Sequence, residues 1–431
     1  MSKIYKIGFL GFGTVAGGVY KHLTANFSDM CAKFGAKFEI GKVCVRDINK
    51  PRAIDIDKAK LTENPYDIVD DPEIDIVCEL MGGIEPAFEL TMRAFKNGKV
   101  VVSANKAVIS NKGKELLQEA KKHNVAYFFE ASVAGGIPVI KALREGLIAN
   151  RFPMIYGILN GTCNYILTRM ERENASYAAI IKDARKLGYV EADESLDIDG
   201  IDAAHKISIL AYLAHGVWIP LNKMLVRGIR GIRLEDMIWA RDFDCRVKLI
   251  ASVRKIPESG ALFASVYPAL LPLSDAVANV NDVFNAVSIE GDVVGRTIYI
   301  GRGAGQDATA SAVIADIAEA VRYLLGAPLI ATKDDVPLKL AHLHEVSGEF
   351  YLRIEVQDKV GVLASLASIL ACEQISIEQL QQRKHETAGR AWVVLTTHKT
   401  DEGSIKKVCA ALKKAPFVYS EPFVLRIFSG K

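Results

Sequence analysis

The chain has almost no excess of charge. Its 54 Lys and Arg residues face 51 Asp and Glu residues, which leaves a net charge of +3 over 431 residues. Nucleic acids and anionic membranes are recognised by clustered positive charge, so no partner of either kind is expected. Apolar runs long enough to span a bilayer are also lacking, and we expect no signal peptide. The sequence therefore predicts a soluble, cytoplasmic protein that acts on a small molecule.

The seven cysteines show neither CxxC nor CxxxH spacing. That excludes the common zinc patterns and favours reduced thiols. Half of the residues are apolar, enough for the cores of two or three domains.

A strand signal at residues 3–10 runs directly into a glycine turn and an amphipathic helix. Gly11 permits the tight turn, Gly13 lets the backbone approach a pyrophosphate, and Ala16 lets the helix pack against the strand. This order predicts dinucleotide binding, with the following cofactor contacts in the turn: Gly11, Phe12, Gly13, Thr14 and Val15.

The end of the second expected strand, residues 38–47, decides the cofactor. An acidic residue there favours NAD, but this chain has Arg46, with Lys50 and Arg52 close behind. We therefore expect NADP. The alternative is that Asp47 binds the ribose hydroxyls and Arg46 points to solvent, which would make NAD the cofactor.

Further strand signals at 74–80, 99–103 and 125–131 alternate with helical stretches. Alternation of this kind predicts an α/β fold, a Rossmann-like doubly wound parallel sheet. Ligands of such sheets lie beyond the carboxyl ends of the strands, where we expect Gly82, Ser103 and Lys106 to contact the cofactor. The alternative for Lys106 is a solvated lysine at a helix start.

The acidic run at residues 191–206 ends in Lys206. It resembles a calcium-binding loop, but that loop needs a carboxylate at its twelfth position, which Lys206 occupies. Asp202 and Lys206 fall four residues apart on one helical face, a spacing that often marks only a surface ion pair. The helix that follows is apolar nearly all round, so Lys206 should instead be partly desolvated, which favours a readily titrated amine.

Several segments together resemble homoserine dehydrogenase over essentially the whole chain. They are the glycine turn, Ser103-Ala-Asn-Lys106, Glu130-Ala-Ser-Val-Ala-Gly-Gly-Ile-Pro138, Asn160-Gly-Thr-Cys-Asn-Tyr-Ile-Leu167, Leu187-Gly-Tyr-Val-Glu-Ala-Asp193 and Asp199-Gly-Ile-Asp-Ala-Ala-His-Lys206. The resemblance implies NAD(P)-dependent interconversion of L-homoserine and L-aspartate 4-semialdehyde, a step toward threonine and methionine. It also implies the monofunctional form, without an aspartokinase segment.

The resemblance assigns roles that the chemistry supports. Reduction of an aldehyde requires a proton for the nascent alkoxide, and a positioned ammonium is a suitable acid. Lys206 matches the proton donor, while Lys106 would hold the reacting oxygen or relay the proton. Glu191 matches the residue that binds the amino-acid substrate, and Asp197 and Asp202 match acids that orient the lysine and the substrate. Two further glycines are expected as cofactor contacts: Gly188 and Gly305.

The segment from Glu130 resembles the monovalent-cation loop of this family, and the resemblance implies that the ion is sodium. One carboxylate with backbone carbonyls suits a hard, weakly held ion. The carbonyl ligands would be those of Val133, Gly135 and Ile137. The alternative is an ordinary Gly-Gly turn.

We expect four segments. They are a nucleotide-binding domain at 1–137 completed by about 301–330, an α+β substrate and dimerisation domain at 138–300, a linker at 331–349, and a regulatory domain at 350–431. The last reads strand, helix, strand, strand, helix, strand, which predicts a ferredoxin-like module, and Asp358-Lys-Val-Gly361 makes it resemble an ACT domain. Such domains bind amino acids at subunit interfaces, so threonine inhibition of a homodimer or homotetramer is our hypothesis. The alternative is an ACT module kept for oligomerisation alone.

Three other functions compete with this one. A dehydrogenase for another hydroxy amino acid shares the same requirements. A phosphorylating semialdehyde dehydrogenase would need an activated cysteine, and no cysteine here has an evident base beside it. A non-catalytic sensor of NADP and an amino acid would need neither Lys106 nor Lys206.

Overall fold

The computed structural model describes residues 3–52, 54–186, 194–329 and 336–428. The chain forms two compact units and passes between them several times. The first unit comprises residues 1–161, 202–224 and 283–338, and the second comprises 162–201, 225–282 and 339–431.

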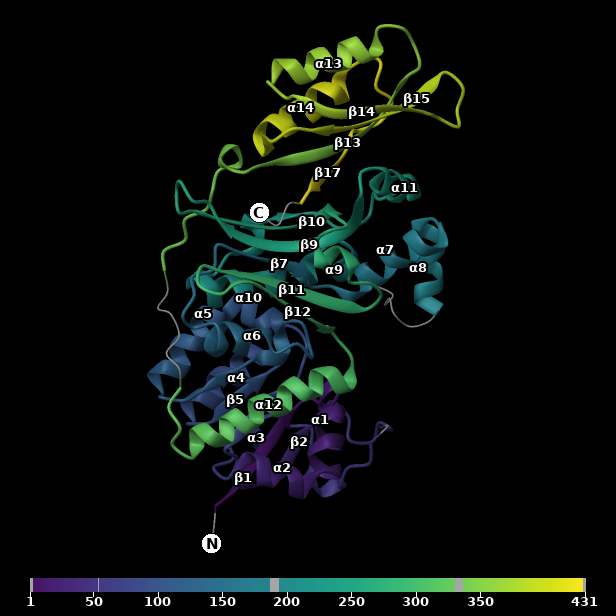
Figure 1. Ribbon diagram of the computed structural model, residues 1–431. Coiled ribbons are helices and arrows are strands. Elements are labelled where there is room, and N and C mark those ends of the chain that lie inside the picture. Colours follow the sequence, from purple (N-terminus) through teal and green to yellow (C-terminus); the bar gives the residue numbers. More distant parts are fainter. Residues whose placement is uncertain (1–2, 53, 187–193, 330–335, 429–431) are drawn as a thin grey trace. The chain divides into compact units, whose positions relative to one another are not determined.

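A six-stranded parallel sheet forms the centre of the first unit (Figure 1). Its strand order is β3-β2-β1-β4-β5-β6, so the direction of winding reverses between β1 and β4. The strands are β1 (Ile4–Leu10), β2 (Lys37–Cys44), β3 (Leu61–Thr62), β4 (Ile76–Glu79), β5 (Val100–Ser103) and β6 (Tyr127–Phe128). The predicted doubly wound sheet is thereby confirmed.

Helices cover this sheet because its central strands have no polar face. All four residues of β4 and all four of β5 are buried, as expected for parallel strands packed on both sides. The crossover and flanking helices are α1 (Thr14–Ala25), α2 (Phe27–Phe34), α3 (Tyr66–Val69), α4 (Ala87–Lys96) and α5 (Lys106–Lys122).

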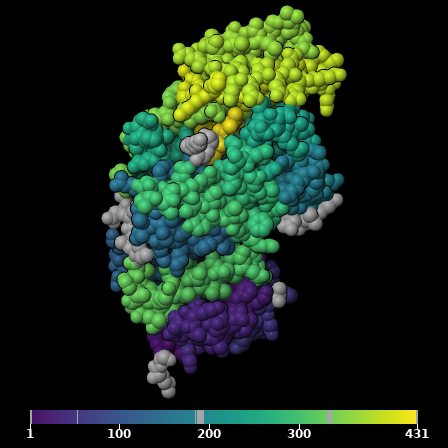
Figure 2. Space-filling model, viewed as in Figure 1, coloured from purple at the N-terminus to yellow at the C-terminus, as the bar shows by residue number. Residues whose placement is uncertain are grey.

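A helix from far along the chain completes the nucleotide-binding fold. α12 (Gln306–Leu324) packs against α1, and Figure 2 shows its green atoms directly against the purple first residues. The approach is close because Gly18 has no side chain: a Cβ there would lie 2.8 Å from Gln306 O. Val313, Ile317 and Val321 of α12 are fully buried in the same core as Val19 and Leu23 of α1.

The rest of the first unit carries a three-stranded antiparallel stretch in which β11 (Phe284–Gly291) lies between β7 (Met154–Ile158) and β12 (Gly295–Arg302). It also contains the short α6 (Val139–Lys141) and α10 (Ile201–His215), whose second to fourteenth residues are buried almost throughout. Burial of α10 follows from its apolar sequence and places the charged residues of its first turns in a desolvated site.

The second unit is built on a long antiparallel hairpin of β9 (Cys245–Lys255) and β10 (Leu262–Pro272). β10 is followed across the sheet by β17 (Phe423–Ile427), β13 (Ser347–Gln357), β15 (Arg390–Thr397) and β14 (Ile377–Lys384), with β8 (Leu225–Val226) and β16 (Thr400–Asp401) at the side. The helices are α7 (Gly161–Glu173), α8 (Tyr177–Lys186), α9 (Ser195–Ile198), α11 (Leu234–Asp242), α13 (Val362–Cys372) and α14 (Glu402–Lys414).

The C-terminal module has the predicted ferredoxin-like order. β13, α13, β14, β15, α14 and β17 follow one another, and α13 and α14 pack together against buried residues of β13 and β15 (Figure 1). Within the described ranges, no helix is both long enough and apolar enough to cross a membrane.

Candidate active site

The glycine turn after β1 has the geometry that a pyrophosphate requires. Gly11 has a φ of +91°, and a Cβ there would lie 3.1 Å from the carbonyl oxygen of Leu80. Gly13 directly precedes α1, and a Cβ on it would meet no atom within 4 Å. Open space therefore lies at the amino end of α1, where the exposed amides can bind an anion.

The residues at the end of β2 are open to solvent. Arg46 and Asp47 are both exposed, and Asp47 Oδ1 accepts a hydrogen bond from Asn49 N (2.8 Å). Arg52, in contrast, donates to the carbonyl oxygens of Ile48 (3.0 Å) and Lys50 (2.9 Å). Arg46 and Asp47 are thus both accessible to a ligand at the end of the strand.

A buried carboxyl group lies at the ends of β4 and β5. Glu79 is fully buried and accepts hydrogen bonds from Met81 N (3.0 Å), Ser103 Oγ (2.7 Å) and Asn105 Nδ2 (3.3 Å). Asn105 Nδ2 also donates to Gly83 O (2.7 Å). Burial raises the pKa of Glu79 to about 7, and the hydrogen bonds that it accepts offset only part of that effect.

Two lysines meet at one carboxylate. Lys106, the first residue of α5, lies with Nζ 2.7 Å from Asp202 Oδ1, and Lys206 Nζ donates to Asp202 Oδ2 at 2.8 Å. The Lys206 side chain is 9% exposed, whereas that of Lys106 is 43% exposed. One amine is therefore enclosed and the other can be reached from solvent.

The peptide that follows β7 fixes this cluster. Lys206 Nζ also donates to the carbonyl oxygen of Leu159 (2.7 Å), and Asn160 Nδ2 donates to Asp202 Oδ2 (2.9 Å). Burial alone would raise the pKa of Asp202, but the charges of Lys206 and Lys106 outweigh it and lower that pKa below its usual value. Asp202 therefore stays ionised and orients both amines.

Two further buried carboxyl groups, those of Glu130 and Asp316, lie at the loop that follows β6. Glu130 accepts from Ile140 N (2.9 Å) and Lys141 N (2.8 Å), and its own amide donates to Asp316 Oδ2 (2.8 Å). Burial raises the pKa of Glu130 to about 7 and that of Asp316 well above its usual value. Two buried carboxyl groups would be stabilised by a cation. Among the described residues no group of three or more His, Cys, Asp and Glu could hold a metal, so an ion here would depend on backbone carbonyls.

Comparison with known proteins identifies the family to which this geometry belongs. The family model described as homoserine dehydrogenase, NAD binding domain, matches residues 11–130, the model of homoserine dehydrogenase matches 138–318, and that of the ACT domain matches 350–417. A homoserine dehydrogenase of Pseudomonas aeruginosa is 39% identical over 95% of this chain and 96% of its own length. The chain belongs to the homoserine dehydrogenase family.

Solved structures agree with this assignment. A homoserine dehydrogenase from Thiobacillus denitrificans has a TM-score of 0.92 at 38% identity, with 99% of each chain covered. A hyperthermophilic archaeal homoserine dehydrogenase in complex with NADPH has a TM-score of 0.63 at 28% identity and covers 76% of this chain and all of its own. The protein is thus an oxidoreductase with a nicotinamide-binding Rossmann domain and an ACT domain, as the sequence motifs predicted.

The predicted site residues of this dehydrogenase lie in different parts of the chain. Lys106, Asp202 and Lys206 come together in the first unit. Asp197 lies on α9 in the second unit, where its carbonyl oxygen accepts from Cys163 Sγ (3.2 Å). Gly188 and Glu191 lie outside the described residues.

The remaining predicted contacts belong to loops of the first unit. Gly82 has open space where a Cβ would be, and Gly305 (φ +113°) directly precedes α12. Val133 and Ile137 are buried in the loop after Glu130, where the Ile137 carbonyl oxygen accepts from Val139 N (2.8 Å).

Three side chains of the site were missed at the sequence level: Glu79, Asn105 and Asn160. A signal existed for Glu79, because a carboxylate that ends an apolar strand directly before a glycine loop is unusual. Asn105 begins α5 as its cap, with Oδ1 accepting from Val108 N (3.2 Å).

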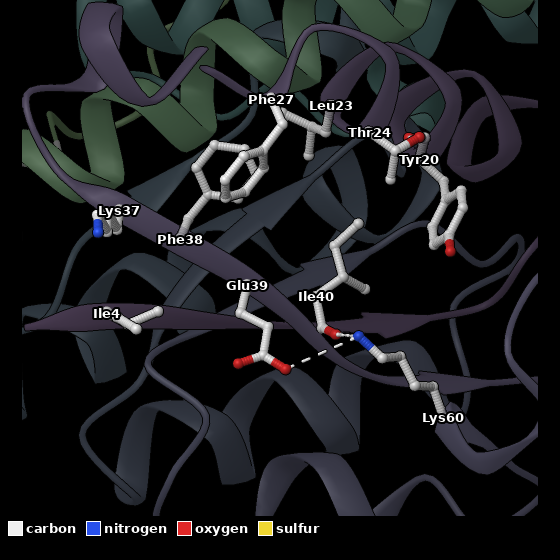
Figure 3. Close-up of a pocket in the computed structure, with 10 residues that line it drawn as sticks. All are labelled: Ile4, Tyr20, Leu23, Thr24, Phe27, Lys37, Phe38, Glu39, Ile40 and Lys60. Atoms are coloured by element: carbon white, nitrogen blue, oxygen red, sulfur yellow. Dashed lines mark hydrogen bonds and ion pairs between the residues drawn. The ribbon is translucent and has the colours of Figure 1, made fainter. Parts of the chain in front are cut away.

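A hollow of about 310 Å³ beside α1 is not part of this site (Figure 3). The rings of Phe27 and Phe38 pack against each other in its wall, with their centroids 5.0 Å apart, and Lys60 donates to Ile40 O at 2.8 Å. Ile4 and Lys37, the first residues of β1 and β2, line it. It therefore lies toward the amino ends of these strands, the edge opposite to the glycine turn, where cofactors of parallel sheets do not bind.

Proposed function

We propose that the protein interconverts L-homoserine and L-aspartate 4-semialdehyde by hydride transfer, with Lys206 as proton donor and acceptor. The observation that carries this mechanism is the contact of both Lys106 and Lys206 with the single carboxylate of Asp202. The glycine turn at residues 11–15 would hold the pyrophosphate of a nicotinamide dinucleotide, which when bound would supply or accept the hydride.

The residues of the cluster provide the proton transfer that accompanies hydride transfer. Hydride addition to the aldehyde carbon leaves an alkoxide oxygen that must gain a proton. Lys206 delivers this proton from a site where burial strengthens charge interactions. Lys106, which is more exposed, holds the reacting oxygen or relays the proton to solvent. Asp202 orients both amines and carries no proton itself, since its lowered pKa keeps it ionised.

Recognition of the amino-acid substrate is assigned to Glu191 and Asp197, by resemblance alone. A substrate with an ammonium group needs a carboxylate partner, and both residues carry one. The reaction belongs to threonine and methionine biosynthesis on the same resemblance.

NADP is the preferred cofactor in this proposal. The exposed guanidinium of Arg46 supports it, because a 2′-phosphate adds charge that an arginine can bind. A measured preference for NADH over NADPH that Asp47→Ala abolishes would contradict it.

A sodium ion at the loop 130–137 is proposed on the family resemblance of this segment and on the burial of two neighbouring carboxyl groups, those of Glu130 and Asp316. A cation would favour their ionised forms and hold Glu130, Val133, Gly135 and Ile137 in one arrangement.

Self-association and threonine inhibition complete the proposal. β12 is the last strand of its sheet among the described residues, and Val293 (70% exposed), Val294 (52%) and Ile300 (55%) present apolar side chains on its hairpin. An apolar edge strand of this kind favours pairing with a second copy, in a dimer or tetramer.

The ACT domain is the expected site for threonine. An unchanged rate and an unchanged thermal midpoint in millimolar L-threonine, compared with D-threonine, would contradict inhibition.

The decisive experiment is NADPH oxidation with L-aspartate 4-semialdehyde. We expect Lys206→Ala to lower kcat by about 100-fold or more, the usual contribution of a positioned general acid. Lys112→Ala is the matched control, because Lys112 is a surface lysine of α5 that pairs with Glu115 at 3.4 Å. Equal rates for Lys206→Ala and the wild type would remove the mechanism.

A further inference from the structure

Glu79 lies where the sheet reverses its direction of winding. It is the last residue of β4, and β4 is the neighbour of β1, which leads into the glycine turn. Ligands of doubly wound sheets bind beyond the carboxyl ends of the strands at this switch point. A fully buried carboxyl group at such a place needs a physical explanation.

The side chain joins two segments that are not adjacent in sequence. Glu79 Oε1 accepts from the amide of Met81, in the loop that contains Gly82, and also from Asn105 Nδ2. Glu79 Oε2 accepts from Ser103 Oγ, which in turn accepts from Asn105 N at 3.0 Å. The loop after β4 and the start of α5 are therefore bound to the same carboxyl group.

Asn105 extends this connection in both directions. Its Nδ2 donates to the carbonyl oxygen of Gly83 at 2.7 Å, and its Oδ1 caps α5 at Val108 N. Lys106 is the next residue and the first of the helix. A shift of Asn105 would move the Lys106 backbone with it.

Burying the Glu79 carboxyl group costs more free energy than a purely structural role would justify. Among the described residues, no lysine or arginine forms an ion pair with Glu79, and burial raises its pKa to about 7. An apolar side chain of similar size would avoid the desolvation of a carboxyl group. What an apolar side chain cannot do is accept hydrogen bonds from both segments.

We infer that Glu79 is a positioning residue that sets the distance between the loop 81–83 and the start of α5, and so places Lys106 relative to the bound nicotinamide. The inference rests on the proposed function of Lys106 and Gly82. Glu79 itself lies beneath the site and acts through Met81, Ser103 and Asn105.

Glu79→Leu separates positioning from stability. Leucine removes the desolvated carboxyl group but leaves Met81 N, Ser103 Oγ and Asn105 Nδ2 without this acceptor. These opposite effects should lower the thermal midpoint only moderately and leave the protein folded at the temperature of the assay. We expect kcat for semialdehyde reduction to fall by about ten-fold or more, because small displacements of a catalytic group are expensive. The Kd for NADPH, measured by its fluorescence without substrate, should rise several-fold, since the loop 81–83 loses its tie.

Glu79→Gln is the conservative variant. Its Oε1 can still accept from Met81 and Asn105, and its amide can donate to Ser103 Oγ, whose hydroxyl then donates elsewhere. We expect glutamine to restore most of kcat and NADPH affinity. Glu119→Leu is the matched control, because Glu119 lies near the far end of α5 from Lys106 and pairs with His123 at 3.2 Å. It should leave both quantities unchanged.

The outcomes distinguish the inference from the proposed function. A wild-type protein that does not reduce the semialdehyde would contradict the proposed function, while the NADPH titration would still test the tie to the loop 81–83. An active wild type, with wild-type kcat and NADPH affinity in Glu79→Leu, would overturn the inference. Equal losses in the leucine and glutamine variants would overturn it as well, because they would indicate a need for the charge itself.

Discussion

Two buried carboxylates with cationic partners, one in each unit, differ in what they can do. Asp202 contacts two lysines, and the side chain of one of them, Lys106, is 43% exposed. Asp236, on α11 of the second unit, is fully buried. It accepts from Tyr351 Oη (2.8 Å) and Arg233 N (2.8 Å), and lies 3.2 Å from Nη1 of Arg353.

The electrostatic balance separates the two sites. Burial raises the pKa of Asp236, and the charge of Arg353 offsets only part of this, whereas two lysines lower the pKa of Asp202. Arg353 is itself 5% exposed, so the cation paired with Asp236 is far less accessible than Lys106. Burial and charge pairing alone therefore do not mark a catalytic group. A partner that solvent or substrate can reach is also needed.

The largest effect is expected for Asp236→Ala. This change leaves Arg353 buried without its carboxylate, which costs about 3–5 kcal/mol in the free energy of unfolding. Urea unfolding can be followed by tryptophan fluorescence, since Trp239 and Trp392 lie 6.3 Å apart in the same unit. Asp242→Ala, in the exposed last turn of α11, is the control and should cost less than about 1 kcal/mol. An Asp236→Ala protein of wild-type stability would contradict the structural role.

A smaller loss, in activity, is expected for Asp202→Asn. The amide cannot hold two ammonium groups, so kcat should fall by about 100-fold, or roughly 2.7 kcal/mol, while circular dichroism stays unchanged. Steady-state kinetics with both substrates measure it. If kcat were retained, Asp202 would be no more catalytic than Asp236, and the contrast between the clusters would fail.

Tyr351→Phe is a smaller perturbation of the cluster around Asp236. The change removes one hydrogen bond to Asp236 and should lower the free energy of unfolding by about 1–2 kcal/mol with no change in kcat. A loss of activity without a loss of stability would show that the second cluster contributes to the reaction.

Acid titration should affect the two aspartates in opposite directions. The lowered pKa of Asp202 means that its contribution to stability is present above its unfolded pKa of about 3.9 and is lost as the pH falls below it. The raised pKa of Asp236 means that acidification relieves a cost. The difference in thermal midpoint between the wild type and Asp202→Asn should therefore shrink below pH 4, and that for Asp236→Asn should not.

Much of the fold followed from local patterns. The glycine turn after the first strand, the buried apolar strands and the order of elements in the C-terminal module were all readable, because period, turn chemistry and hydrophobic runs are properties of neighbouring residues. The return of α12 to the first strands was expected only from the family resemblance. It depends on the close approach that Gly18 allows and on the shared apolar core, which no local pattern reveals.

The site divides in the same way. The spacing of Asp202 and Lys206 placed them on one helical face, so their contact could be expected from the sequence. That Lys106, nearly a hundred residues earlier, shares the same carboxylate could not, and neither could the ties of Glu79 to Ser103 and Asn105. The sequence by itself determined which residues are candidates for the chemistry. Only the tertiary structure decided which of them meet and which stay accessible, because distance, burial and desolvation arise when separate segments pack together.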